Sequence, residues 1–145
     1  MPIYMKYGTI DGGVTAAGLK GWIELESFTW GVTNTRSVTG GSHLNVSDIT
    51  IDKMVDKASV PLLKQLVFGK PTNGVMMKFY KLFRTVQTLY LEITLDNTLV
   101  SSYSLGAEGG SGGAPARESL SLNFAKLNIQ YSGQTAFGIV VPPPA

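Results

Sequence analysis

Hydrophobic and polar residues alternate along most of this chain, a pattern typical of β-strands that bury one face. The alternation runs through residues 3–7, 46–55, 75–83 and 89–105. The last of these segments is long for one strand, so a β-bulge is predicted near residues 96–97. The chain is therefore predicted to be mostly β.

Two segments change the side on which their apolar residues lie. In residues 21–31 the apolar set moves from odd to even positions, and in residues 120–131 it moves from even to odd. A strand has a side-chain period of two, so such a change requires a bulge or a different apolar environment on each side. We expect a strongly bent barrel, or one whose outer face also meets a partner.

One helix is predicted, starting at Ser59 and ending before Gly69. Ser59 is placed to cap it, Pro61 is tolerated in the first turn, and Gly69 favours the left-handed conformation that ends helices. At about nine residues the helix is too short to be stable alone, so its apolar stripe must pack on the domain. That stripe is predicted to be Leu62, Leu63, Leu66 and Val67.

Two stretches rich in small residues are predicted to be loops. Residues 104–117 contain five glycines, but neither a helix start nor the Lys-Ser/Thr pair of a phosphate-binding loop follows them. That stretch is therefore interpreted as a flexible connection. Residues 34–45 form a polar loop that holds Arg36 and His43.

Composition favours one domain over residues 1–141 with a proline-rich tail at 142–145. Charged residues make up 15% of the chain, against about 25% in ordinary soluble domains, which suggests a surface partly covered by other protein. The net charge of +2 does not by itself imply nucleic acid. The chain has no cysteine, so a disulfide framework and a Cys-based zinc site are excluded. No membrane-spanning run or cleaved signal is expected.

Nothing in the sequence assembles a catalytic or metal site. His43, the only histidine, has no nucleophile or carboxylate at a recognisable spacing. Asp48, Asp52 and Asp56 recur every four residues, but β-branched residues between them disfavour a helix, and the spacing matches no calcium loop. Catalytic, cofactor and metal sites are all predicted to be absent.

Two weaker alternatives rest on strand residues. Glu24 and Glu26 lie two apart and could form the acid/base pair of a hydrolase, although such pairs usually come from different elements. Five aromatic residues could stack on a sugar, although strand aromatics are more often core; these are Trp22, Trp30, Tyr90, Tyr103 and Tyr131. A ligand- or carbohydrate-binding barrel therefore stays open beside an assembly subunit, and the hydrolase ranks last.

Five segments, taken in order, closely resemble the haemolysin-coregulated protein (Hcp) family, the tube subunits of bacterial type VI secretion. They are residues 4–6, 21–32, 55–59, 90–102 and 118–126, of which the longest unbroken motif is GWIELESFTWGV. Each motif is loose by itself. Their order is specific, and the match runs from about residue 1 to 131.

The resemblance implies a small closed barrel of two β-sheets with one flanking α-helix, assembled as hexameric rings that stack into the inner tube of a contractile apparatus. It implies no catalysis and no cofactor. Its partners would be copies of itself and the sheath, spike and effector proteins, with no nucleic acid and no membrane insertion. The tube would form in the bacterial cytoplasm and then be secreted without a cleaved signal peptide, holding effectors in its lumen.

The resemblance also points to particular residues. Residues 34–45 correspond in order to the family's extended loop that reaches toward the next ring, where the stacking residues are expected to be Arg36, Thr39, Gly40 and Gly41. Thr29 and Ser111 are expected on the lumen wall, where family members place small polar residues. The end of the chain departs from the family, because it is short and proline-rich and is expected to lack a further strand that many members carry.

Overall fold

The computed structural model describes residues 2–36, 38, 40–110, 112–113 and 115–141. These residues form twelve strands and one helix. The strands are β1 Ile3–Tyr7, β2 Ile23–Leu25, β3 Ser27–Thr29, β4 Val32–Arg36, β5 Ser42–Val46, β6 Ile49–Met54, β7 Val75–Phe83, β8 Val86–Asp96, β9 Leu99–Gly106, β10 Arg117–Asn123, β11 Lys126–Tyr131 and β12 Phe137–Val140. The helix is α1 Ser59–Phe68.

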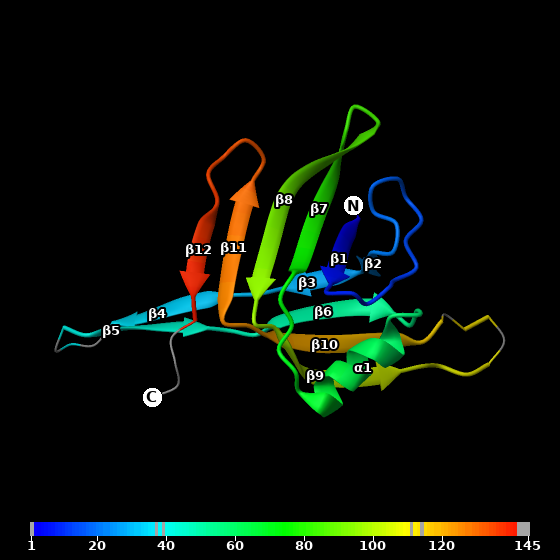
Figure 1. The fold of residues 1–145 in the computed structure, drawn as a ribbon, viewed down its shortest axis with the longest axis horizontal. Helices are drawn as coiled ribbons and strands as arrows, with labels where there is room; N and C mark the ends of the chain where they lie inside the picture. Colours follow the sequence, from blue (N-terminus) through cyan, green and yellow to red (C-terminus); the bar gives the residue numbers. More distant parts are fainter. Residues whose placement is uncertain (1, 37, 39, 111, 114, 142–145) are drawn as a thin grey trace.

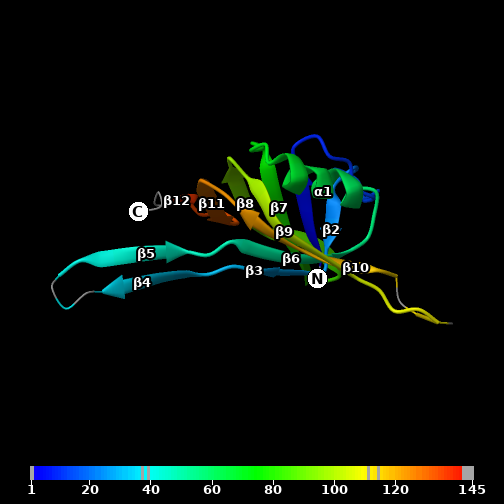
Figure 2. The same cartoon turned by 90° about the horizontal axis from the view of Figure 1, so that it is seen from below.

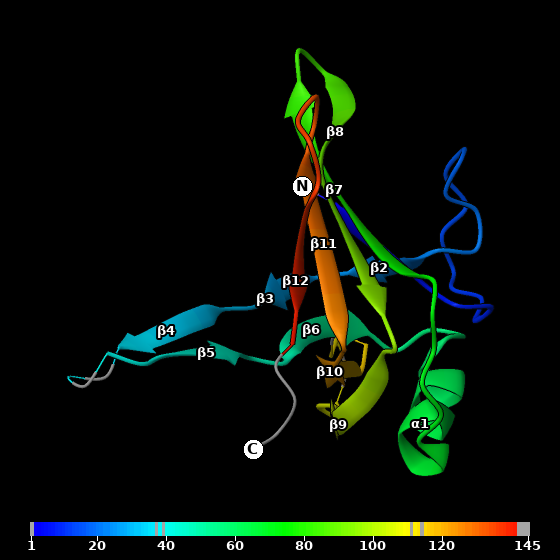
Figure 3. The same ribbon diagram turned by 60° about the vertical axis from the view of Figure 1, so that its left-hand side comes forward.

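The strands form three antiparallel sheets. The six-stranded sheet has the order β12-β11-β8-β7-β1-β2, the four-stranded sheet has the order β3-β6-β10-β9, and β4 pairs only with β5. The first two sheets pack against each other with their strands crossing steeply (Figure 3), and α1 lies beside β9. The prediction of a mostly-β fold with one helix is confirmed.

The prediction of a closed barrel is wrong, because both large sheets are open. Strands β2 and β12 are the free edges of the six-stranded sheet, and β3 and β9 are those of the four-stranded sheet. A barrel closes only when its first and last strands pair. Here the chain passes between the sheets through sharp turns that interrupt the hydrogen-bonded ladder, so no strand joins the two edges.

These crossings explain the two changes of phase in the sequence. Strand β2 lies in the six-stranded sheet and β3 in the four-stranded sheet, and Glu26 between them donates its N–H to the carbonyl of Asp52 at 2.7 Å. Strands β10 and β11 are divided between the sheets in the same way. Each half of such a segment therefore buries its apolar residues against the shared core from a different side.

The bulge predicted near residues 96–97 is also a crossing. Asn97 has a φ of 48° and separates β8 from β9, which lie in different sheets. The register shifts lie elsewhere, between Phe79 and Tyr80 and between Ser121 and Leu122. A left-handed Asn turns the chain sharply at little cost, because its side chain is tolerated there.

The core lies between the two large sheets. Apolar residues on the inner faces of both sheets are almost fully buried, and Tyr7 also donates its hydroxyl to the carbonyl of Thr98 at 3.2 Å. The sheet members with at most 1% exposure are Met5, Tyr7, Ile23, Ile49, Ile51, Val75, Met77, Ile93, Leu95, Leu120, Leu122 and Leu127, and Ala58 and Leu62 pack against them. The two inner faces therefore bury each other.

Helix α1 ends as predicted but begins differently. Gly69 adopts a φ of 64° and donates its N–H to Gln65 at 2.9 Å, the expected left-handed end. Ser59 is the first helical residue rather than the cap, and the N-cap position is Ala58, which makes no side-chain cap bond. The predicted apolar stripe is only partly buried, since Leu62 packs in the core while Leu63 and Val67 are exposed.

Two segments predicted to lack strands contain them. Strands β4 and β5 form a two-stranded arm that extends away from the body of the domain (Figures 1 and 2). Strand β12 pairs with β11 at the end of the chain, so the expected absence of a further strand is wrong. The predicted tail, 142–145, lies outside the described residues, and the domain boundary at residue 141 stays a prediction.

Candidate functional site

The outward face of the four-stranded sheet carries two rows of small polar side chains. Cross-strand partners point to the same face, and the pairing register aligns four residues in each row. The first row is Thr29, Thr50, Ser121 and Ser102, and the second is Ser27, Asp52, Ser119 and Ser104. These eight residues are called the hydroxyl face below.

The hydroxyl face is set by strict alternation along β6 and β10. Ile51 and Leu120 pair with each other and are fully buried, so their sequence neighbours must point the other way. Seven of the eight outward side chains are Ser or Thr, which donate and accept hydrogen bonds without a fixed charge. Asp52 is the exception, and it accepts a bond from the Ser27 hydroxyl at 2.7 Å.

A shallow pocket of about 410 Å³ indents one end of the hydroxyl face. Ser27, Asp52 and Ser104 contribute to its lining, together with Glu26 and Arg117. Arg117 and Glu26 form an exposed ion pair with 3.3 Å between nitrogen and oxygen. This end of the face therefore combines hydroxyl groups with charges that are largely balanced within the chain.

A buried ionic network lies directly beneath this face. Lys53 and Glu118 are paired across β6 and β10, and the side chains of both are inaccessible to solvent. The Lys53 ammonium also donates to Asp56 at 2.8 Å and to the carbonyl of Met54 at 2.9 Å. Such a charge pair is tolerated in the interior only because its hydrogen-bonding groups are satisfied.

Glu118 gathers donors from three other elements. It accepts bonds from Lys53, from the Tyr103 hydroxyl of β9, and from the Ser59 hydroxyl of α1 at 2.7 Å. Burial raises the pKa of Glu118, but these bonds outweigh it and hold the pKa below its usual value. For Tyr103, burial and the bond to Glu118 raise the pKa to about 12.

The network seats the start of α1 on the four-stranded sheet. Ser59 turns its hydroxyl inward to Glu118 and also accepts the backbone N–H of Asp56 at 2.9 Å. The sequence reasoning missed Lys53 and Glu118. The signal was present, because Lys53 continues the buried alternation of Ile49 and Ile51, and Glu118 continues that of Leu120 and Leu122.

The residues predicted for ring stacking and for the lumen wall lie in different places. Arg36 ends β4 and Gly40 and Gly41 precede β5, so these three lie together at the end of the arm, all exposed. Thr29 lies on the hydroxyl face. Thr39 and Ser111 lie outside the described residues. The roles of all six residues stay predictions.

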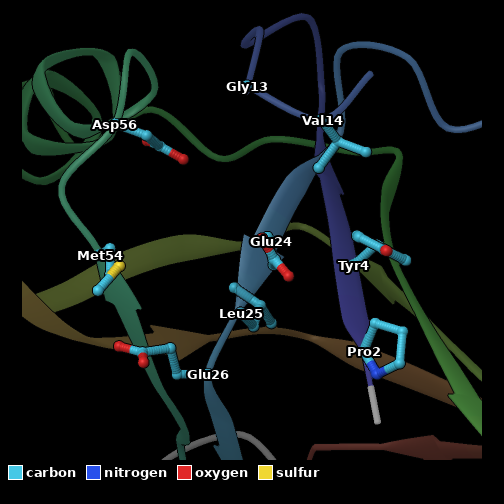
Figure 4. Close-up of a pocket in the computed structure, with 9 residues that line it drawn as sticks. All are labelled: Pro2, Tyr4, Gly13, Val14, Glu24, Leu25, Glu26, Met54 and Asp56. Atoms are coloured by element: carbon cyan, nitrogen blue, oxygen red, sulfur yellow. The ribbon is translucent and has the colours of Figure 1, made fainter. Parts of the chain in front are cut away.

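The acidic residues noted in the sequence do not form one centre. Glu24 points into a groove beside β2 (Figure 4), whereas Glu26 is engaged by Arg117. Asp48 accepts bonds from the Ser101 hydroxyl at 2.7 Å and from the Asn123 amide at 3.0 Å. Within the described ranges, no group of three or more His, Cys, Asp or Glu residues is placed to hold a metal ion.

The aromatic residues do not form a single platform either. Trp22 is buried, Trp30 donates its indole N–H to the carbonyl of Ser47 at 3.1 Å and packs against Phe124, and Tyr103 donates its hydroxyl to Glu118.

In the part of the chain that the structure describes, no helix is long and apolar enough to cross a membrane.

The fold defines a class of mostly-β proteins, with two crossed open sheets, one flanking helix and a projecting arm. Structures of other proteins with this fold have been solved. Hcp1 from Salmonella typhimurium has a TM-score of 0.81 and 24% identity, with 96% of this chain and 93% of that chain covered. Hcp1 from E. coli EAEC 042 has a TM-score of 0.83 and 18% identity, covering 97% and 99%.

Sequence comparison points the same way. Protein hcp1 from Pseudomonas aeruginosa is 35% identical over 95 residues, which is 66% of this chain and 57% of that protein. The protein family described as "Type VI secretion system effector, Hcp" matches residues 4–131. The chain belongs to the Hcp family of type VI secretion proteins.

Proposed function

We propose that this chain is a subunit of the inner tube of a type VI secretion apparatus, in which six copies close into a ring and the hydroxyl face lines the channel. The hydroxyl face carries the proposal. A channel wall that must let proteins pass has to be wetted, yet must not hold its cargo through large apolar or strongly charged side chains. Rows of Ser and Thr meet both conditions.

The free edges of the four-stranded sheet support ring closure. Strands β3 and β9 each leave one side unpaired, and an unpaired edge is a template for another strand. Because the two edges differ, joining β9 of one copy to β3 of the next is a head-to-tail contact, which closes into a ring when the rotation allows. The hydroxyl faces would then form one continuous inner surface.

The arm supports the stacking of rings. A two-stranded hairpin is marginal in water without further packing, and the arm projects beyond the domain (Figure 2). Docking on a neighbouring ring would stabilise it. We therefore assign ring stacking to the arm, with Arg36, Thr39, Gly40 and Gly41 at the contact.

The remaining roles follow from the tube. Effectors would travel in the lumen against the hydroxyl face, of which Thr29 is a member. Ser111 keeps its expected role on the lumen wall, and sheath and spike proteins would contact the outside and the end of the tube. The subunit would be located in the bacterial cytoplasm before secretion and would leave the cell when the apparatus contracts and expels the tube. The chain would act only as a subunit of the assembly and would need neither a catalytic site nor a cofactor.

Light scattering coupled to size exclusion tests the ring. Six copies of the 15.5-kDa chain should give a particle of about 93 kDa. A chain that stays monomeric at high concentration contradicts the proposal, and saturable sugar binding by that monomer would favour the alternative carbohydrate-binding module.

Cysteine labelling tests which face lines the channel. The natural chain has no cysteine, so Ser102→Cys places a single thiol on the hydroxyl face. In stacked rings this thiol should react with a small maleimide but be shielded from a maleimide carried on a large globular protein. Ala16→Cys, in the exposed connection between β1 and β2, is the matched control and should react with both reagents. Equal reaction of Ser102→Cys with the large reagent would place the hydroxyl face outside.

A further inference from the structure

A groove opens beside β2, at the edge of the six-stranded sheet. It has a volume of about 690 Å³, and its apolar lining comes from Pro2, Tyr4, Val14, Leu25 and Met54. The side chain of Glu24 projects into it (Figure 4). This cavity is called the Glu24 groove.

The backbone of the groove is incompletely paired. On the side of β2 that faces away from β1, the Trp22 carbonyl accepts from Val14 at 3.1 Å, and the Glu26 N–H donates to Asp52 at 2.7 Å. Backbone groups of alternate strand residues point the same way, so the N–H and carbonyl of Glu24 also point away from β1. Strand β2 is the sheet edge, which leaves these two groups facing the groove.

The groove also contains one carboxylate, that of Glu24, that is available for an ion pair. Its other two carboxylates are engaged, since Glu26 pairs with Arg117 and Asp56 with Lys53. Glu24 has no ion pair among the described residues. Burial, and then the negative charge of Glu24, raise the pKa of Tyr4 on the neighbouring strand. The groove therefore combines apolar walls with one carboxylate, that of Glu24, that is available for pairing.

The tip of the hairpin formed by β7 and β8 has the opposite character. Three apolar side chains are largely exposed there, at 60% for Leu82, 57% for Phe83 and 62% for Val86. Arg84 lies among them, with its guanidinium carbon 5.4 Å from the centre of the Phe83 ring. Arg84 has no ion pair within the described part of the chain. The tip is thus apolar with one available cation.

The turn at this tip is built against local preference. Arg84 and Thr85 have φ values of 49° and 67°, in the left-handed region that Gly and Asn normally occupy in such two-residue turns. Strained non-glycine residues persist where another requirement outweighs their conformational cost. Here the strain presents Arg84 and the three apolar side chains together at the end of a projecting hairpin (Figure 1).

We propose that the tip of the β7–β8 hairpin docks in the Glu24 groove of a second copy of this chain, with Arg84 paired to Glu24 and the exposed apolar side chains packed on the apolar walls. The proposal rests on the self-assembly proposed above and names one of its contacts. Tip and groove are different surfaces of the chain, since Arg84 lies in the β7–β8 turn and Glu24 on β2. The contact is therefore head-to-tail, the type that builds rings and stacks.

Charge reversal tests the pairing. Arg84→Glu and Glu24→Arg should each raise the subunit concentration at which assemblies form by about tenfold or more, because each places like charges together. The double variant Arg84→Glu/Glu24→Arg should bring that concentration back to within about threefold of the natural chain. Lys20→Glu, an exposed reversal in the β1–β2 connection, is the matched control and should leave assembly unchanged.

A second variant separates assembly from stability. Replacing the turn by Arg84→Asn/Thr85→Gly should raise the thermal midpoint of the monomer by relieving the turn, yet weaken assembly by removing the cation. If this variant and both single reversals assemble at the same subunit concentration as the natural chain, the proposed contact is wrong, although the ring itself would still stand. Failure of the double reversal to restore assembly would overturn the pairing. A natural chain that never assembles would overturn the contact and the proposed function together.

Discussion

The buried pair of Lys53 and Glu118 gives the sharpest test of how this fold is held together. The change is Lys53→Met, which keeps the length and apolar stem of the side chain but removes its charge. Both partners have 0% side-chain exposure, so the Glu118 carboxylate would be left in the interior with only the hydroxyl groups of Ser59 and Tyr103. Removing one member of a buried ion pair typically costs about 3–5 kcal/mol.

That loss is large for a domain of this size, whose total free energy of unfolding is typically about 5–15 kcal/mol. Urea unfolding, followed by the fluorescence of Trp22 and Trp30, should therefore show a much lower midpoint for Lys53→Met. The measurement should be made at concentrations where light scattering gives the monomer mass, because assembly adds its own stabilisation.

The matched control removes both charges. In Lys53→Met/Glu118→Leu the interior holds no unpaired ion, and apolar replacement of a whole buried pair is often neutral or stabilising. The double variant should regain most of the loss, leaving a deficit of about 1–2 kcal/mol from the hydrogen bonds of Ser59 and Tyr103. A single variant that loses less than about 1 kcal/mol, or a double variant no better than the single, would refute the reasoning.

Acid should weaken the natural chain through the same pair. The folded state lowers the pKa of Glu118 below its ordinary value of 4.5, so the contribution of this group to stability is present above that value and is lost as pH falls through the folded pKa. In Lys53→Met the principal cation that lowers this pKa is absent. The difference in unfolding free energy between the two proteins should therefore narrow as pH falls below 4.5, and a constant difference down to acid unfolding would contradict this assignment.

Two further predictions concern glycine packing and alkaline stability. A Cβ at Gly12 would lie 2.2 Å from the Trp22 carbonyl oxygen, so Gly12→Ala should cost about 3 kcal/mol or more. Gly13→Ala is the control, because no atom lies within 4 Å of a Cβ added at Gly13. It should change the free energy of unfolding by less than about 0.5 kcal/mol in the same urea assay. Similar losses in the two variants would contradict the packing argument. Burial raises the pKa of Tyr7 from 10.0 to about 12, so its contribution is full below pH 10 and is lost as pH rises through 12. Tyr7→Phe should lower the free energy of unfolding by about 1 kcal/mol at pH 8, because the hydrogen bond to Thr98 is lost. Between pH 10 and 12 the free energy of unfolding should fall less in this variant than in the natural chain. The same fall in both proteins would show that Tyr7 is not the titrating group.

The sequence predicted strands where one face is plainly apolar. Alternation located β1, β6, β7 and β8, and Gly69 fixed the end of the helix. The arm was missed because β4 and β5 are mostly polar, with Val32, Leu44 and Val46 as their only apolar residues. Strand β12 was missed because four residues that include Gly138 carry too short a pattern. Alternation describes one strand at a time, so it could not show that a change of phase was a passage from one sheet to the other.

The site was less accessible to sequence reasoning than the fold. Thr29 was expected on a functional wall, but the other members of the hydroxyl face become a surface only when β3, β6, β10 and β9 are aligned in register. Lys53 and Glu118 were overlooked because charged residues are usually exposed. Their positions in two buried alternations were visible, but their pairing depends on strands that are more than sixty residues apart in the chain.

The repeated passage of the chain between its two large sheets has a consequence for how the subunit comes into being. At Glu26, at Asn97 and after Asn123 the backbone leaves one sheet for the other, and pairings such as β1 with β7 and β6 with β10 join distant segments. Neither layer can mature while the other is incomplete, so folding should be a single, comparatively slow cooperative step dominated by non-local contacts. Assembly would then draw only on finished subunits, because a nascent or truncated chain would lack the edges on which a neighbour could dock.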